Sequence, residues 1–258
     1  MRVKTLAQIL ITEPNRSSMS ANVEYGALFG TLEYLVRVGI GNPPSYQYMV
    51  VDTGSDLPWI QCQPCFHCYP QFDPIYDPKQ SSSYSEASCE STKCQFLGKY
   101  HSCENQQCKY KMSYGDGSSS AGLLAYDTFR FGNTKVSSIA FGCGHQNEGF
   151  VNSGGILGLG RGDLSFLNQL GGKSAGIFSY CLVEPGSEAC IGIGDETIAN
   201  GAAWIPIMYN PRADPSYYYL ENMVVPIPEQ AFQLNYKGQG GVILDTGTVI
   251  TRFPRASR

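Results

Sequence analysis

The tripeptide Asp-Thr-Gly occurs twice in this chain, each time after a short apolar run and before a hydroxyl residue. The first copy is residues 52–54, followed by Ser55, and the second is residues 245–247, followed by Thr248. The two aspartates lie 193 residues apart (245 − 52). Since a given tripeptide falls at roughly one position in several thousand, a matched pair is not expected by chance. Each copy predicts a buried strand that runs into a tight turn carrying a carboxylate.

Two such turns placed face to face would bring two carboxyl groups together. Like charges a few ångströms apart cannot both ionise cheaply, so one carboxyl keeps a proton while the other is ionised. The ionised group can then deprotonate a water while the other protonates a peptide carbonyl. We therefore expect Asp52 and Asp245 to be catalytic, with no metal ion and no cofactor. Ser55 and Thr248 can hydrogen-bond the carboxyl oxygens.

Composition favours an all-β protein. The chain has 258 residues, of which 42% are hydrophobic, and short β-rich runs alternate with turns rich in its 29 glycines and 15 prolines. Lys and Arg total 18 against 22 acidic residues, with no basic run, which argues against a nucleic-acid partner. No apolar stretch is long enough to cross a membrane.

Ten cysteines, most of them clustered, indicate disulfides formed in an oxidising compartment. The spacing Cys62-x2-Cys65-x-His67-Cys68 also resembles a zinc site. Only this one cluster is tight, however, and the other cysteines lie in a Ser-rich region. Disulfides are therefore the favoured interpretation.

The chain divides into four predicted parts. Residues 1–24 form an irregular segment, whose apolar run is too short for a secretory signal, so we expect that the sequence lacks its true start. Residues 25–183 form a β lobe with the first Asp-Thr-Gly and a Cys-rich insertion at 62–108. Residues 184–216 connect to a partial second lobe, 217–258, with the second Asp-Thr-Gly. One helix is expected at residues 163–170, with Asp163 as its N-cap.

In combination, the motifs resemble those of the pepsin-like aspartic proteases, in the plant nepenthesin-like group and its guard-cell type. The similarity covers about residues 34–254. The motifs that carry it, besides the two Asp-Thr-Gly copies, are Glu33-Tyr34, Val38-Gly39-Ile40-Gly41, Trp59-Ile60-Gln61-Cys62, Cys143-Gly144-His145, Asn147-Glu148-Gly149, Gly155-Ile156-Leu157-Gly158-Leu159-Gly160 and Phe178-Ser179-Tyr180-Cys181-Leu182-Val183.

The resemblance implies a bilobal all-β fold with a complete N-terminal lobe and a truncated C-terminal lobe, the chain being truncated at both ends. It implies an aspartic endopeptidase that cleaves polypeptides at acidic pH, works as a monomer and follows the secretory pathway to the extracellular space, the apoplast or the vacuole.

The resemblance also assigns roles to further residues. Tyr114 would lie on a flap over the substrate, with its hydroxyl toward the Trp59 indole, and Thr53 and Thr246 would cross-link the two catalytic loops. Flap residues Gly115, Asp116 and Gly117, and the turn glycines Gly54 and Gly247, complete the predicted site.

The resemblance implies the disulfides Cys62–Cys65, Cys68–Cys143, Cys89–Cys108 and Cys94–Cys103. The usual partner of Cys181, near the end of the family's chains, has no counterpart here. Cys190 can substitute, or both residues can remain thiols.

Three alternatives to an active monomeric enzyme stay open. A xylanase-inhibitor-like binding protein would have the same fold without protease activity. An inactive, truncated product is the second alternative. In the third, two chains would pair to give an Asp52–Asp52 site, as in retroviral proteases, and only this one requires a dimer.

Overall fold

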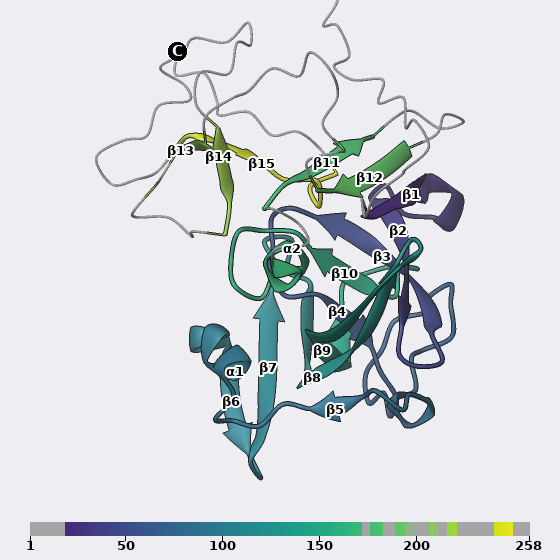
Figure 1. Cartoon of the computed structure of the whole chain (residues 1–258), viewed down its shortest axis with the longest axis vertical. Helices are drawn as coiled ribbons and strands as arrows, with labels where there is room; N and C mark the ends of the chain where they lie inside the picture. Colours follow the sequence, from purple (N-terminus) through teal and green to yellow (C-terminus); the bar gives the residue numbers. More distant parts are fainter. Residues whose placement is uncertain are drawn as a thin grey trace, which may run out of the picture.

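A computed structural model describes residues 19–171, 176–182, 189–194, 197, 207–208, 210, 216–220 and 240–249. Strands make up nearly all of the regular structure of these residues, and the few helices are short (Figure 1). The all-β prediction is confirmed.

The strands are β1 (Met19–Tyr25), β2 (Tyr34–Ile40), β3 (Ser45–Asp52), β4 (Trp59–Gln61), β5 (Ser85–Glu86), β6 (His101–Glu104), β7 (Gln107–Ser113), β8 (Ser119–Phe131), β9 (Thr134–Glu148), β10 (Gly155–Gly158), β11 (Phe178–Cys181), β12 (Ala189–Ile193), β13 (Ile207–Met208), β14 (Tyr218–Leu220) and β15 (Val242–Leu244). The α-helices are α1 (Thr92–Phe96) and α2 (Phe166–Gln169), and 3₁₀ turns occupy Gly26–Phe29, Pro78–Gln80 and Gly98–Tyr100.

Twelve strands form one mixed sheet in the order β11-β12-β1-β2-β3-β10-β4-β9-β8-β7-β6, with β5 also paired to β8. A separate sheet has the order β13-β14-β15. In the large sheet β10 runs parallel to β3, so that Gly158 lies opposite Asp52. The ring of Tyr218 in β14 lies 5.8 Å from that of Phe178 in β11, which brings the small sheet against the large one.

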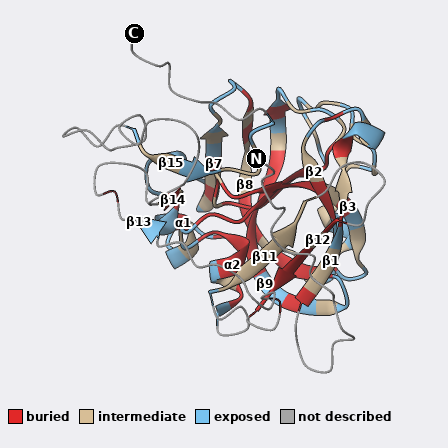
Figure 2. Cartoon of the chain, turned by 90° about the horizontal axis from the view of Figure 1, so that it is seen from above, coloured by how far each residue is buried: buried red, intermediate tan, exposed pale blue. Residues whose placement is uncertain are grey.

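Strand β3 is buried on both of its faces, because successive side chains of a strand point to opposite sides. Met49 and Val51 belong to one hydrophobic cluster, which also contains Phe129 and Phe141. Val50 belongs to a second cluster, on the other side of the strand. Buried positions accordingly run along the middle of the strands, with exposed ones toward their ends and in loops (Figure 2). This two-sided core fixes the end of β3, where Asp52 lies.

Two predicted domain boundaries do not match the strands. The predicted irregular segment 1–24 includes most of β1, which pairs with β2 and β12; residues 1–18 lie outside the described part. The predicted connection 184–216 includes β12, which is part of the large sheet. Both strands pair with partners far away in sequence, so local composition gave no sign of them.

The predicted helix is shorter than expected. Helix α2 spans only Phe166–Gln169, and its N-cap is Ser165, whose Oγ accepts a hydrogen bond from the backbone N–H of Asn168 (3.2 Å). Asp163 is therefore not the cap. Its backbone carbonyl accepts a hydrogen bond from Lys93 Nζ instead (3.0 Å).

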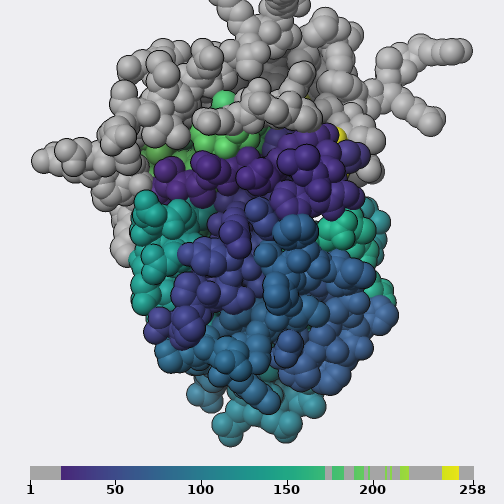
Figure 3. Space-filling model, turned by 90° about the vertical axis from the view of Figure 1, so that its right-hand side faces the viewer, coloured from purple at the N-terminus to yellow at the C-terminus, as the bar shows by residue number. Residues whose placement is uncertain are grey.

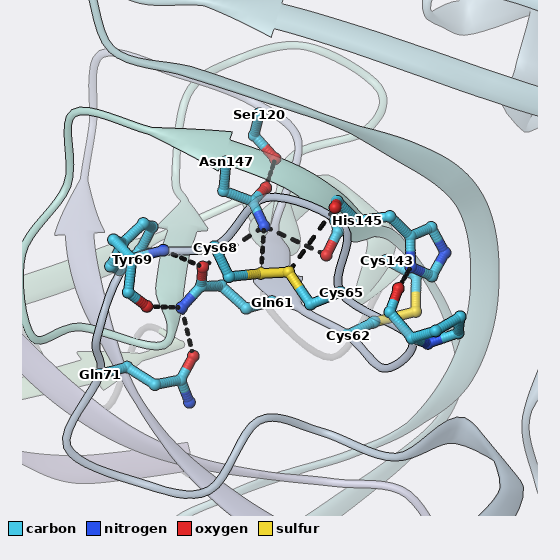
Figure 4. The surroundings of a disulfide bond; sticks show 12 residues. Gln61, Cys62, Cys65, Cys68, Tyr69, Gln71, Ser120, Cys143, His145 and Asn147 are labelled. Carbon is cyan, nitrogen blue, oxygen red and sulfur yellow. Dashed lines mark hydrogen bonds between the residues drawn. A yellow bond between two sulfur atoms is a disulfide. The ribbon is translucent and has the colours of Figure 1, made fainter.

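All eight cysteines assigned to disulfides are in disulfides, but each of the four predicted pairings is wrong. The bonds are Cys62–Cys143, Cys65–Cys68, Cys89–Cys103 and Cys94–Cys108. Figure 4 shows the first two of these bonds. The first follows from the sheet, because β4 runs parallel to β9 and the backbone N–H of Cys62 donates to the carbonyl of Gly144. With their sulfurs in disulfides, the cysteines of the alternative zinc motif are not available as ligands.

Cys181 and Cys190 lie directly opposite each other in the β11–β12 pair and are not in disulfides.

Seen from the side, strands β1 to β3 and the following Cys-rich region form one continuous face (Figure 3). Within the described residues, no helix is both long and apolar enough to cross a membrane.

Candidate active site

The first Asp-Thr-Gly forms the loop that follows β3. The Asp52 side chain is only 6% exposed. Its Oδ1 accepts a hydrogen bond from the backbone N–H of Gly54 (2.8 Å), and its Oδ2 accepts one from the Ser55 hydroxyl. Its carbonyl accepts another from the N–H of Leu159, just after β10 (2.7 Å). The carboxyl group is therefore held at both oxygens, and the backbone behind it is held by the sheet.

The second Asp-Thr-Gly repeats this arrangement after β15. The backbone N–H of Gly247 donates to Asp245 Oδ1 (3.0 Å), and the Thr248 hydroxyl donates to Asp245 Oδ2 (2.5 Å). Each carboxyl thus receives one backbone and one hydroxyl hydrogen bond from the same positions of its loop.

Two threonines join the loops to each other. Thr53 Oγ1 accepts from the N–H of Thr246 (3.0 Å) and donates to the carbonyl of Leu244 (2.9 Å). Reciprocally, Thr246 Oγ1 accepts from the N–H of Thr53 (3.1 Å) and donates to the carbonyl of Val51 (2.7 Å). Each threonine thus makes the same two hydrogen bonds to the opposite loop. Together the four bonds hold the two aspartates toward each other.

The glycines of both motifs leave room for the opposite carboxyl group. A Cβ added at Gly247 would lie 2.5 Å from Asp52 Oδ1, and one added at Gly54 would lie 2.7 Å from Asp245 Oδ1. Contacts below about 3 Å are not tolerated, so any larger residue would push the carboxyl groups apart. The structure thus brings Asp52 and Asp245 of one chain together, and no second chain is needed to supply a partner for Asp52.

The electrostatic setting of Asp52 favours its protonated form. Burial of the carboxyl raises the pKa of Asp52 above its ordinary value, and the neighbouring Asp245 raises it further. The hydrogen bonds from Ser55 and Gly54 oppose this rise because they stabilise the carboxylate. A buried carboxyl beside a second one, each with fixed hydrogen bonds, is an arrangement suited to acid–base chemistry.

The hairpin of β7 and β8 carries Tyr114 at its tip. The turn closes through the N–H of Tyr114 and the carbonyl of Ser118 (2.9 Å), with Gly117 at φ +91°. The Tyr114 hydroxyl accepts a hydrogen bond from Nε1 of the buried Trp59 (2.6 Å). Burial, and then the charge of Asp52, raise the pKa of Tyr114.

Comparison with known proteins identifies the family. A family model described as "Xylanase inhibitor N-terminal" matches residues 34–195. "Protein ASPARTIC PROTEASE IN GUARD CELL 2" of Arabidopsis thaliana is 45% identical over 238 residues, which is 88% of this chain and 50% of that protein. "Aspartic proteinase nepenthesin-2" of Nepenthes gracilis is 40% identical over 249 residues, 92% of this chain and 56% of that protein. The chain belongs to the pepsin-like aspartic protease family. It spans about half the length of the curated relatives it matches.

Solved structures agree with a pepsin-like fold. The crystal structure of edgp has a TM-score of 0.65 at 18% identity and covers 89% of this chain and 64% of its own. The aspartic proteinase from Irpex lacteus has a TM-score of 0.52 at 19% identity, with coverages of 75% and 54%. At these identities the similarity shows the pepsin-like fold alone.

Phe150 is a site residue that the sequence analysis missed. Its ring lies 4.9 Å from that of Trp59, 5.8 Å from that of Tyr69 and 5.4 Å from that of Tyr114. Phe150 therefore packs against Tyr114 and supports the tip of the β7–β8 hairpin. The signal was its place directly after the family motif Asn147-Glu148-Gly149.

Asp56 was missed as well. Its Oδ1 accepts a hydrogen bond from the N–H of Gly162 (2.8 Å), and its Oδ2 accepts one from the Ser216 hydroxyl. Asp56 ties the loop of the first Asp-Thr-Gly both to the segment after β10 and to the residues just before β14. Its position after Ser55 gave no hint of these distant partners.

We expect Tyr114→Phe to destabilise the hairpin tip. The change leaves the buried Trp59 N–H without its acceptor, which costs about 1–3 kcal/mol. Urea unfolding monitored by tryptophan fluorescence measures this cost. Tyr126→Phe is the matched control on β8, because its hydroxyl makes no hydrogen bond within the described residues. Equal stability of the two variants would contradict the role of the Trp59–Tyr114 bond.

Proposed function

We propose that this chain is, or is part of, an aspartic endopeptidase that hydrolyses peptide bonds with water activated by Asp52 and Asp245. The observation that carries the proposal is the pair of reciprocally cross-linked loops, which turns the buried carboxyl of Asp52 and the half-buried carboxyl of Asp245 toward each other. Membership of the pepsin-like family supports it.

The chemistry uses one shared proton. The ionised aspartate takes a proton from a water held between the carboxyls while the other donates its proton to the carbonyl oxygen of the scissile bond. Attack by this water gives a tetrahedral intermediate with no covalent bond to the enzyme. When the C–N bond breaks, the leaving amine takes the proton that the first aspartate removed from water, and a hydroxyl of the intermediate returns its proton to the second aspartate, so the pair regains its starting state. Since one carboxyl must be protonated, activity belongs to acidic pH.

The substrate proposed is an extended polypeptide bound beneath the β7–β8 hairpin. Main-chain hydrogen bonds would hold the peptide, and apolar side chains would lie against the aromatic rings near the tip. Closure of the hairpin, with Tyr114, Gly115, Asp116 and Gly117 at its tip, would exclude water from the carboxyl pair.

Cleavage of a denatured protein between about pH 2 and about pH 8, a range that brackets the ordinary Asp pKa of about 3.9, tests the proposal. We expect cleavage at acidic pH that falls steeply toward neutral pH and is blocked by pepstatin, an inhibitor of pepsin-like enzymes. Cleavage that persists with pepstatin, or that has its maximum at neutral pH, would point to another protease in the sample.

A second candidate is a binding protein without catalysis, because the matching family model is that of xylanase inhibitors. An inactive, truncated form of the protease is the related alternative. A folded chain that cleaves nothing at any pH, but inhibits a xylanase, would support the binding protein. The intact carboxyl pair with its full set of hydrogen bonds favours the protease.

We also propose that the protein follows the secretory pathway, with the extracellular space, the apoplast or the vacuole as its destination, and the four disulfides support this proposal. We further propose that it acts as a monomer, since both aspartates come from one chain. Gel filtration of the oxidised protein tests the second point, and a dimer would contradict it.

A further inference from the structure

A cavity of about 660 Å³ lies beside the β7–β8 hairpin, away from the carboxyl pair. We call it the rear cavity and define it by Phe66, Lys79, Tyr84, Lys111 and His145, which are among its lining residues. The predicted catalytic and flap residues are not among the residues that line it.

The lysines of β7 that line the rear cavity lie on one face of the strand. Side chains alternate along a strand, so Lys109 and Lys111 point to one face while Tyr110 and Met112 point to the other. Tyr110 is buried in the cluster that contains Trp59 and against which Tyr114 packs. Tyr110 also contributes to the lining of the cavity, whereas the side chains of Lys109 and Lys111 belong to the face opposite that cluster.

The central strands beside the rear cavity have no open edge. Strand β7 is paired on both sides, with β6 and β8, and β8 is paired with β7 and β9. Strand β6, at the edge of the sheet, contributes Ser102 to the lining. An extended peptide is usually recognised by adding a strand to an open edge, which β7 and β8 do not allow, so a ligand over these two strands is recognised by side chains.

The walls present an exposed aromatic ring and amide groups. Phe66 is 73% exposed, which is unusual for a phenylalanine at the mouth of a cavity. Its ring lies 6.1 Å from that of His145, which is held by a hydrogen bond between Nδ1 and the carbonyl of Pro64 (2.9 Å). Gln63 and Gln146 add exposed amides to the lining. The electron-rich face of a ring attracts the C–H groups of a sugar, and amides can both donate to and accept from its hydroxyls.

The lining also carries excess positive charge in a protein of net charge −4. Lys79, Lys109 and Lys111 line the cavity, against a single acidic residue, Glu86. Lys109 pairs with Glu104 outside the lining. Within the described residues Lys79 and Lys111 make no ion pair. Two ammonium groups beside a sugar-binding surface match a ligand that carries carboxylates.

We propose that the rear cavity binds an acidic oligosaccharide, that is, a short chain of uronic acid residues. The rings and amides contact the sugar faces and hydroxyls, and Lys79 and Lys111 pair with the carboxylates. The cavity volume is within the usual range of about 300–1,000 Å³ for small-ligand sites. The site does not depend on the carboxyl pair, so it would exist in an active protease and in an inactive binding protein alike.

Isothermal titration of the oxidised chain with a uronic acid trisaccharide tests the proposal. A neutral trisaccharide and a glutamate tripeptide serve as comparison ligands. We expect the uronic acid trimer to bind at least about 10-fold more tightly than either one, and its affinity to fall with rising salt. Equal binding of the neutral sugar would overturn the assignment of the charge. Tighter binding of the glutamate peptide would replace the sugar by an acidic peptide.

Single substitutions locate the binding. We expect Lys111→Gln and Phe66→Ala each to weaken the uronate complex by about 10-fold, equivalent to about 1.4 kcal/mol. Lys135→Gln is the matched control, because this exposed lysine of β9 does not line the cavity. Since Phe66 and Lys111 are exposed, thermal unfolding of these variants should match that of the wild-type chain. Failure of the trimer to bind, or equal loss in Lys135→Gln, would overturn the proposal.

Discussion

Asp52→Asn is expected to lower the rate of peptide cleavage by at least about 10³-fold while leaving the fold intact. Asparagine has the shape of aspartate, and its amide oxygen can still accept the hydrogen bond from Gly54 or Ser55. It cannot take a proton from water, however, and general acid–base groups contribute about 10²–10⁴-fold to a rate. Turnover of a quenched-fluorescent peptide at acidic pH measures the loss.

The control for this experiment is Asp163→Asn. It removes the same charge from an exposed aspartate whose side chain makes no hydrogen bond within the described residues. We expect full activity from this variant. If Asp52→Asn kept the wild-type rate at every pH, the assignment of the carboxyl pair would be wrong, because Asp245 would then work without an ionisable partner.

The same variant has a second expected effect, on the pH dependence of stability. The pKa of Asp52 is raised in the folded chain, chiefly by burial. Between the ordinary value of about 3.9 and the raised one, the folded state binds more protons than the unfolded state, so stability falls as the pH rises through this window. Asp52→Asn cannot ionise, and its stability should change less over that window. Urea unfolding at several pH values from about 4 upward compares the two proteins.

Sequence reasoning located the parts of the site that depend on local patterns. Each Asp-Thr-Gly copy is recognised in the sequence by the apolar strand before it and the turn that it forms. Both carboxyl groups lie in the loop that directly follows such a strand, as predicted. Tyr114 and Trp59 came only through the family resemblance, since nothing local relates a hairpin tip to an indole 55 positions away.

What the sequence did not reveal depends on long-range pairing. Strand β12 joins the large sheet through β1, which joins it through β2, and neither β1 nor β12 has an apolar pattern strong enough to predict it alone. The disulfides were paired wrongly because several cysteines lie close together in the insertion. Cys103 lies directly opposite Cys108 in the β6–β7 pair, yet each bonds to a different partner. Small shifts of backbone decide between such pairings, and sequence spacing does not record them.

Thr53→Val is expected to separate the two catalytic loops. Valine has nearly the shape of threonine but lacks the hydroxyl that accepts from the N–H of Thr246 and donates to the carbonyl of Leu244. Thr53 itself is fully buried, whereas the lost partners are partly open to water, so we expect a cost of about 1–3 kcal/mol. That cost corresponds to a roughly 5- to 150-fold loss of cleavage rate, provided that the loops must be joined for the carboxyl groups to share a proton.

Two further variants separate the hydroxyl from the space it fills. Thr53→Ser keeps the hydroxyl and should restore most of the activity, whereas Thr134→Val removes a threonine hydroxyl of β9 that makes no hydrogen bond within the described residues and should change nothing. Hydrogen exchange gives a readout independent of activity, because the amide of Thr246 is protected by Thr53. Its protection should be lost in Thr53→Val and kept in Thr53→Ser. Unchanged protection in the valine variant would mean that β15 is held against β3 by other contacts, and the cross-linked pair of threonines would then not be what assembles the site.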